Sequence, residues 1–214
     1  MGRSPKSEGD TRTRILGAAT EHFAEHGYDG ARTQAIADAA GVNKAMLYYH
    51  FRDKQHLYRE TLKSHFLEIV LQVIPSFTDS TREPRERVME IVRAYSRFLR
   101  DHPHMRALML RELATGGREV IAVIADIRRE VPALDPRAVL GGLQEMMARG
   151  QIREEDPRQV FLHLISLALF PHIARPLVAY LAELPPAEMD RLLEERPAAV
   201  ARLLEHGLLT MEVS

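Results

Sequence analysis

Histidine is the side chain in this sequence best suited to bind a metal ion or transfer a proton near pH 7, and the 214-residue chain contains ten. The candidates are the pair His102 and His104 and the separated residues His163 and His172. The sequence contains no His-Glu-x-x-His pair and no carboxylate cluster with ligand spacing beside these histidines. It also has no cysteine, no Gly-x-Ser-x-Gly turn and no phosphate-binding glycine loop. We therefore expect no catalytic residue, no bound metal, no cofactor and no enzymatic activity.

The segment 44–51 carries a second group of side chains with chemical potential. On a helical wheel at about 100° per residue, Leu47 and Phe51 share one face. The opposite face carries Ala45, Met46 and Tyr49. An exposed apolar face beside Lys44 and His50 requires a partner. Double-stranded DNA is suitable, because small apolar groups contact thymine methyls, lysine reaches guanine or phosphate, and tyrosine hydroxyls reach phosphates. The alternative is that this second face packs on a neighbouring domain.

The elements that position these side chains are helices. Apolar residues recur at intervals of three and four through almost the whole chain, and no segment alternates convincingly, so an all-α fold is expected. A first helix is predicted to begin at a cap provided by Asp10 or Thr11. It ends at Gly27, which can adopt the left-handed conformation while Tyr28 packs back on the helix.

Two short helices follow. Thr33 is predicted to cap the second helix, which Gly41 ends, and Asn43 to cap a third from Lys44 to about Phe51. Two helices joined by a tight glycine-containing turn are typical of the helix-turn-helix arrangement, which places its second helix in the major groove.

The run from Thr33 to Lys54 resembles the signature of TetR-family transcriptional regulators. Its specific elements are Thr33, Ile36-Ala37, Ala40-Gly41-Val42, Leu47-Tyr48-Tyr49-His50-Phe51 and Lys54. The resemblance implies that the residues in contact with DNA are Thr33, Gln34, Lys44, Ala45, Met46, Tyr48, Tyr49, His50 and Lys54. Asn43 stands where many members have Ser or Thr, but it is an equally good cap. Met46 replaces a commonly small residue, which leaves the base preference open.

Charge does not by itself indicate a nucleic-acid partner. The formal net charge is −1, and the segment up to Lys54 is nearly neutral, so DNA binding must depend on where the charges lie. Four early basic residues could form an arm that contacts phosphates or a solvated tail: Arg3, Lys6, Arg12 and Arg14.

The remainder is predicted to be a larger helical domain. We expect residues 1–55 to form the helix-turn-helix domain with a short N-terminal arm, and residues 56–214 an effector-binding and dimerisation domain. The expected helices are 53–73, ended by Pro75, one from Pro84 to His102, and then 104–114, 117–130, 136–149, 157–181 and 186–208.

The resemblance also implies a homodimer formed by the last two long helices. The candidate interface residues are Leu162, Ile165, Leu169, Phe170, Leu203 and Leu204. The alternative is that these residues are buried within one subunit. Soft and aromatic side chains could line an effector cavity, although each could equally be core: Phe66, Tyr95, Phe98, Met105, Met109, Met147 and Phe161.

The function predicted from these features is a ligand-responsive DNA-binding regulator. We expect a dimeric repressor that binds a palindromic operator and is released by a small apolar or aromatic effector. Three alternatives remain: a helical small-molecule binder without DNA function, an activator of the same fold, and an enzyme that uses the histidines. The N-terminus has no apolar export segment and the longest apolar runs are too short to span a bilayer, so we expect a cytoplasmic protein without membrane association.

Overall fold

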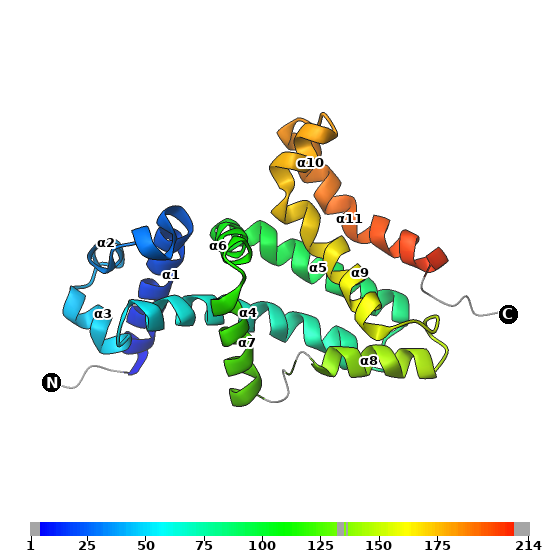
Figure 1. Cartoon of the computed structure of the whole chain (residues 1–214), viewed down its shortest axis with the longest axis horizontal. Coiled ribbons are helices and arrows are strands. Elements are labelled where there is room, and N and C mark those ends of the chain that lie inside the picture. The colour runs from blue at the N-terminus through cyan, green and yellow to red at the C-terminus, as the bar shows by residue number, and fades with distance from the viewer. Residues whose placement is uncertain (1–4, 132–134, 136, 208–214) are drawn as a thin grey trace. The chain divides into compact units, whose positions relative to one another are not determined.

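The protein is built from helices, which the computed structural model describes for residues 5–131, 135 and 137–207 (Figure 1). Eleven helices and no strand occur in this part of the chain, which confirms the all-α class. In order they are α1 (Pro5–Gly30), α2 (Thr33–Ala39), α3 (Lys44–His50), α4 (Lys54–Thr78), α5 (Pro84–Asp101), α6 (Pro103–Ala114), α7 (Arg118–Glu130), α8 (Arg137–Ala148), α9 (Pro157–Ile173), α10 (Arg175–Leu181) and α11 (Pro186–Gly207).

Contacts between residues divide the chain into two compact units. The first comprises Met1–Leu67 and His102–Asp126, and the second comprises Glu68–Asp101 and Ile127–Ser214. The predicted helix-turn-helix segment lies within the first unit, which also contains α6 and parts of α4 and α7.

Helix α1 begins at Pro5, so the prediction that Asp10 or Thr11 caps it was wrong. Proline is well tolerated in a first helical turn, where its missing N–H would have no acceptor in any case. Asp10 lies inside the helix, with its carboxylate 3.7 Å from the Arg14 guanidinium. The predicted apolar stripe is fully buried: Ile15, Ala19 and Phe23.

Helix α1 bends at Gly27 but does not end there, so the predicted left-handed conformation of Gly27 is confirmed and the predicted helix end was wrong. Gly27 has φ 71°, a left-handed value that favours glycine, although α1 continues to Gly30 beyond the bend. The Arg111 side chain on α6 donates to the carbonyls of Ala24 and Glu25, at 3.1 and 3.0 Å. These carbonyls lie just before the bend, where helical N–H partners are interrupted, so Arg111 supplies the missing donors.

Three aromatic rings and a carboxylate pack together beside this bend. The Tyr28 ring lies 6.4 Å from the Phe23 ring, which confirms that Tyr28 packs back on α1, and 5.2 Å from the Tyr58 ring of α4. Tyr58 Oη donates to Glu112 Oε1 at 2.5 Å, and both residues are buried. Burial and this hydrogen bond raise the pKa of Tyr58 well above its usual range, so the phenol keeps its proton.

In the second unit, the end of α4 differs from the prediction. Pro75 lies inside α4 rather than ending it. The buried Arg87 of α5 donates from Nε to the Ser76 carbonyl at 2.9 Å and from Nη2 to the Phe77 carbonyl. Gly142 of α8 approaches the same turn so closely that a Cβ there would lie 2.2 Å from the Phe77 oxygen. The last turn of α4 is therefore stabilised by distant residues.

The predicted helix 157–181 is broken into α9 and α10, which meet at an angle of 81°. Pro176 lies in the first turn of α10, where its missing N–H and fixed φ favour a helix start. Pro171 removes the hydrogen bond that the Leu167 carbonyl would otherwise accept within α9. Arg196 Nε of α11 donates to that carbonyl at 3.2 Å instead. Single-sequence periodicity could not reveal this break, because the apolar spacing continues across it.

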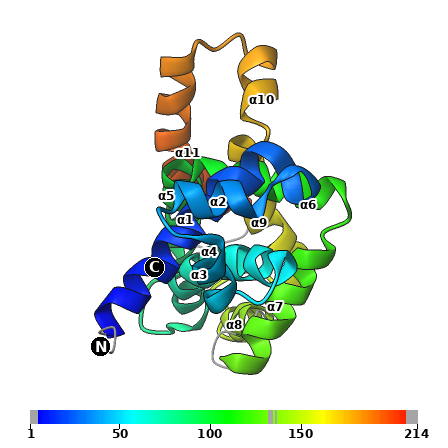
Figure 2. The ribbon, with the colours of Figure 1, turned by 90° about the vertical axis from the view of Figure 1, so that its left-hand side faces the viewer.

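Helices α10 and α11 form an antiparallel pair, joined by residues 182–185 (Figure 2). An ion pair of 2.7 Å between Arg175 and Asp190 connects them. Among the described residues no single helix is long and apolar enough to cross a membrane, and only the bent pair of α9 and α10 taken together passes that test.

The buried hydrogen bond between Tyr58 and Glu112 gives a testable prediction. Tyr58→Phe should lower the free energy of unfolding by about 1–3 kcal/mol, because it deprives a buried carboxylate of a donor. Tyr28→Phe, in the same cluster but at a residue that is 38% exposed, should change it by less than about 0.5 kcal/mol. Urea unfolding followed by circular dichroism measures both, and equal losses would contradict the role given to the hydrogen bond.

Candidate nucleic-acid interface

The turn between α2 and α3 is formed by Gly41. Its φ is +65°, and its N–H donates to the Asp38 carbonyl at 3.0 Å. The next N–H, of Val42, donates to the Ala37 carbonyl at 2.9 Å. These two bonds form a Schellman motif, in which a glycine reverses the chain at the end of a helix. The predicted role of Gly41 is therefore confirmed.

The two helices begin differently. Asn43 caps α3, as predicted, because its side chain accepts a hydrogen bond of 2.7 Å from the Met46 N–H. The cap position of α2 is occupied by Arg32 without a side-chain bond, so the prediction that Thr33 caps α2 was wrong. Thr33 Oγ1 instead lies 3.2 Å from Tyr48 Oη and joins the first residue of α2 to α3.

Helix α3 has one buried and one exposed face, as the helical wheel predicts. Leu47 and the following Phe51 are fully buried, whereas Tyr49 is 72% exposed and Tyr48 39% exposed. Of the other predicted contact residues, those exposed are Gln34, Lys44 and Ala45, and those half-buried are Thr33, Met46, His50 and Lys54. The Lys44 ammonium lies 5.8 Å from the centre of the Tyr48 ring. A cation and two phenols therefore occur together on the outer side of α3.

Two of the predicted contact residues also bind within the protein. Gln34 donates to Asp38 at 2.8 Å, one turn along α2. Lys54 Nζ donates to the Asp29 carbonyl at 3.2 Å and lies 4.9 Å from the centre of the Tyr28 ring. A contact between Lys54 and a phosphate therefore remains a prediction, and it would compete with these interactions.

The early basic residues do not form a separate arm where the structure describes them. Arg12 pairs with Glu60 on α4 and lies over the Phe51 ring. Arg14 Nη1 donates to the Ala40 carbonyl at 3.1 Å, at the end of α2. Arg3 and the side chain of Lys6 lie outside the described part of the chain. Arg12 and Arg14 thus hold α1 against α3, α4 and the turn, which sequence alone could not indicate.

The proposed effector-contacting residues are distributed over both units. Phe66, Met105 and Met109 belong to the first unit, and Tyr95, Phe98, Met147 and Phe161 to the second. Phe98 and Met105 are buried and the others half-buried. Of these residues, only Met147 lines either of two open hollows in the second unit, one of about 490 Å³ beside Glu154 and one of about 650 Å³ around Tyr180. The effector site therefore remains a prediction.

The proposed interface residues separate into two groups by exposure. Leu162, Phe170 and Leu203 are 53%, 58% and 60% exposed. Ile165 and Leu169 are half-buried, and Leu204 is buried within the second unit at 7% exposure. Leu204 therefore packs in the interior, which corresponds to the alternative of burial within one subunit.

The structure also brings together a group that sequence patterns did not predict. His65 and Glu68 on α4 and His102 before α6 place potential ligand atoms within 4.8 Å of one another. The only local signal is the spacing of three between His65 and Glu68, which puts them on one side of a helix. His102 is too distant in sequence to have been associated with them.

Comparisons with known proteins support the interpretation of the first unit. Residues 15–61 match the model of a family described as bacterial regulatory proteins, tetR family. The transcriptional regulator RutR of Escherichia coli strain K12 is 30% identical over 115 residues, covering 54% of this chain and 53% of RutR. The transcriptional activator FasR of Mycolicibacterium smegmatis is 37% identical over 97 residues, covering 45% and 43%. The chain thus spans about half the length of the curated relatives it matches.

Solved structures share the whole fold. SCO4942 of Streptomyces coelicolor superimposes with a TM-score of 0.65 at 24% identity, covering 92% of this chain and 98% of that one. The hemolysin II transcriptional regulator HlyIIR gives 0.60 at 21% identity, covering 90% and 97%. At these identities the similarity establishes the fold alone.

The geometry of α2, the glycine turn and α3 defines a helix-turn-helix domain. Residues 15–61, which include this arrangement, match the tetR family model, so this segment is similar to the DNA-binding segment of bacterial regulatory proteins of that family. The two relatives are named as an HTH-type transcriptional regulator and an HTH-type transcriptional activator.

The conformation of Gly41 gives the second prediction. Gly41→Ala should lower the free energy of unfolding by about 1–2 kcal/mol, because a Cβ disfavours left-handed backbone. Space is sufficient, since the nearest atom to that Cβ would be Arg14 Nη1 at 3.5 Å. The matched change Gly17→Ala, inside α1 with open space around it, should raise the same quantity by about 0.5–1 kcal/mol. If both variants shifted urea unfolding in the same direction, the argument from φ would be wrong.

Proposed function

We propose that the protein binds double-stranded DNA through α3 and regulates transcription. The observation that carries this proposal is the outer face of α3, where Lys44, Tyr48 and Tyr49 are exposed while Leu47 and Phe51 hold the helix in the first unit. A short helix anchored on one face and presenting a cation and phenols on the other suits insertion into a major groove.

Each predicted contact has a chemical role in this complex. Lys44 would bind guanine O6 and N7 or a phosphate, and Ala45 and Met46 would contact thymine methyl groups. Tyr48, Tyr49 and His50 would bind phosphates, with Thr33 and Gln34 approaching from the start of α2. Because Tyr48 and Thr33 already share a hydrogen bond, the two helices would engage the DNA as one unit.

The proposed active form is a homodimer. One helix-turn-helix domain reads few base pairs, whereas a two-fold dimer places two recognition helices in successive major grooves of a palindromic operator. The exposed leucine and phenylalanine side chains of α9 and α11 are the proposed contact surface: Leu162, Phe170 and Leu203. The neighbouring Ile165 and Leu169 would be covered further on dimerisation.

A small apolar or aromatic molecule is the proposed effector. The half-buried methionine and aromatic side chains among the proposed effector-contacting residues can adapt to such a ligand. Its binding would favour a dimer arrangement in which the recognition helices no longer match successive grooves. We propose that the protein represses transcription in the cytoplasm, where bacterial DNA lies. Activation is the alternative outcome, because the relative FasR is named an activator.

The second candidate function is small-molecule binding without DNA recognition. It is motivated by the near neutrality of the N-terminal segment and by the local engagement of Arg12, Arg14 and Lys54. Tight ligand binding with no sequence-selective DNA binding would favour this function.

DNA binding can be measured directly by fluorescence anisotropy. The intact protein should bind DNA from upstream of its own gene, or a duplex selected from random sequence, more tightly than an unrelated duplex, with strong salt dependence. Lys44→Ala should weaken this specific binding by about 1–3 kcal/mol. Arg153→Ala, an exposed cation of the second unit, serves as the control and should leave it unchanged. Failure of the wild type to select any sequence would exclude the proposal.

Sedimentation velocity tests the dimer. Leu203→Glu should raise the dimer dissociation constant at least about tenfold, because it places an unpaired carboxylate in an apolar contact. Ile121→Glu is the matched control, since Ile121 is 64% exposed but lies on α7 in the first unit. A monomeric wild type, or an equal effect of both variants, would contradict this assignment of the interface.

A further inference from the structure

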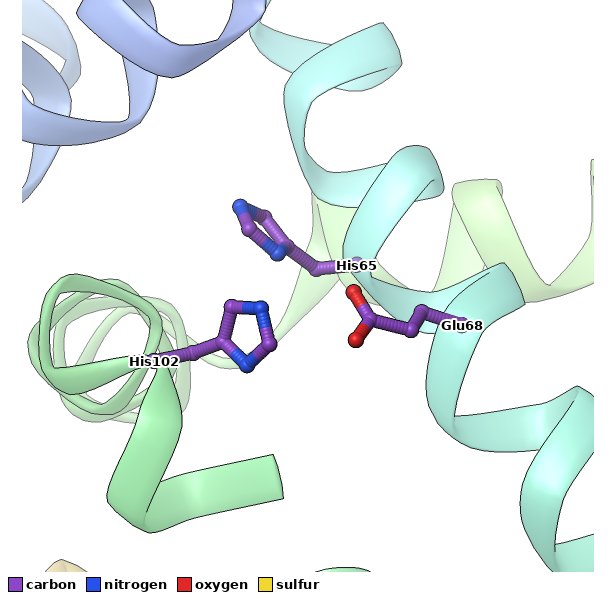
Figure 3. Close-up of side chains that lie close together, drawn as sticks. All are labelled: His65, Glu68 and His102. Carbon is purple, nitrogen blue, oxygen red and sulfur yellow. The ribbon is translucent and has the colours of Figure 1, made fainter. Parts of the chain in front are cut away.

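The strongest unassigned group of side chains lies where α4 passes the beginning of α6. The His65 ring of α4 and the His102 ring, at the residue that precedes α6, meet edge to face with their centres 5.3 Å apart. Glu68 lies one turn after His65 on the same continuous helix. The three side chains point toward one another, and a ligand atom from each lies within 4.8 Å of the other two (Figure 3).

The hydrogen bonds of Thr20 define which nitrogen of His65 carries the proton. Thr20 Oγ1 donates its single proton to the Leu16 carbonyl at 2.8 Å. It also lies 3.0 Å from His65 Nε2, toward which it can therefore only accept. Nε2 must then be the donor, and the lone pair of the ring is on Nδ1. Metal-binding histidines are typically fixed in this way, by donating the other ring N–H to an oxygen of the protein.

We propose that His65, Glu68 and His102 bind one divalent transition-metal ion, for which Zn²⁺ is the best match. Two imidazoles and one carboxylate form a common three-residue zinc ligand set that leaves a fourth position for water. Mg²⁺ and Ca²⁺ prefer oxygen ligands alone, so two imidazoles select against them. This site is independent of the DNA-binding function proposed above.

The distances indicate that the site is nearly assembled. Zn–N and Zn–O bonds of about 2.0–2.2 Å in a tetrahedron place ligand atoms roughly 3.3–3.5 Å apart. The ligand atoms here lie within 4.8 Å of one another, so closure shortens each separation by at most about 1.5 Å. Glu68 is exposed and can supply this movement by side-chain rotation, whereas His65 is half-buried and held by Thr20.

The protonation state of His65 agrees with such a role. Burial, with a contribution from His102, lowers the pKa of His65 to about 4, so the ring is neutral at pH 7. A bound ion would link α4 to the residue that precedes α6. It should therefore raise the unfolding temperature by mass action, because the unfolded chain does not hold the three ligands together.

The test is calorimetric titration of the intact, tag-free protein with Zn²⁺ after chelator treatment and removal of the chelator. The expected result is one tightly bound equivalent and a raised unfolding temperature, with no comparable effect of Mg²⁺. Glu68→Gln and His102→Gln should each weaken Zn²⁺ binding at least tenfold. Circular dichroism without metal checks that both variants fold, and Glu68→Gln, at an exposed residue of nearly the same shape, is the variant least able to disturb packing.

Two control variants exclude binding elsewhere. His163 is exposed on α9, and His22 forms a stacked pair with His26 on α1, with ring centres 5.7 Å apart. His163→Gln and His22→Gln should leave the affinity for Zn²⁺ unchanged. The proposal is overturned if no equivalent binds, if Glu68→Gln and His102→Gln bind as tightly as the wild type, or if His22→Gln removes the binding.

Discussion

The recurring constraint in this structure is the need of helix carbonyls for donors, which arginine side chains from distant parts of the sequence satisfy. Arg111 binds carbonyls of α1, Arg14 binds the carbonyl after α2, Arg87 binds the last turn of α4, and Arg196 binds a carbonyl of α9. Each contact lies at a bend, a turn or a helix end, where helical hydrogen bonds are missing. An all-helical protein with many short helices has many such positions, and an unsatisfied buried carbonyl would cost more than the bond itself contributes.

The candidate DNA-binding surface depends on the same kind of support. Helix α3 has only seven residues, too few to be stable alone in water. It is held by the burial of Leu47 and Phe51, by the Asn43 cap and by the bond from Tyr48 to Thr33. Because Leu47 and Phe51 lie on the inner side and Asn43 at the N-terminal end, the outer side can carry the exposed Tyr49 without loss of fold.

The features predicted correctly from sequence are local ones. The Gly41 turn, the Asn43 cap and the two faces of α3 follow from backbone preference and from a 3.6-residue period within a few residues. The error at the end of α4 has a tertiary cause, because the helix continues past Pro75 beside Arg87 and Gly142. The wrong caps of α1 and α2 show that local preferences leave helix starts uncertain by several residues. The approach of His102 to His65 and Glu68 could not be predicted either, because it joins segments more than thirty residues apart.

The geometry of Arg87 shows why the type of cation matters as much as its charge. One guanidinium donates from two different nitrogens to the two successive carbonyls of Ser76 and Phe77. Lysine at this position would preserve the formal charge and the helical periodicity, yet its single ammonium lacks the planar fork that spans both oxygens. Two sequences with the same net charge and the same predicted helices could therefore differ in whether the end of α4 folds. For this chain, the distinction between arginine and lysine carries architectural information that a count of charges does not.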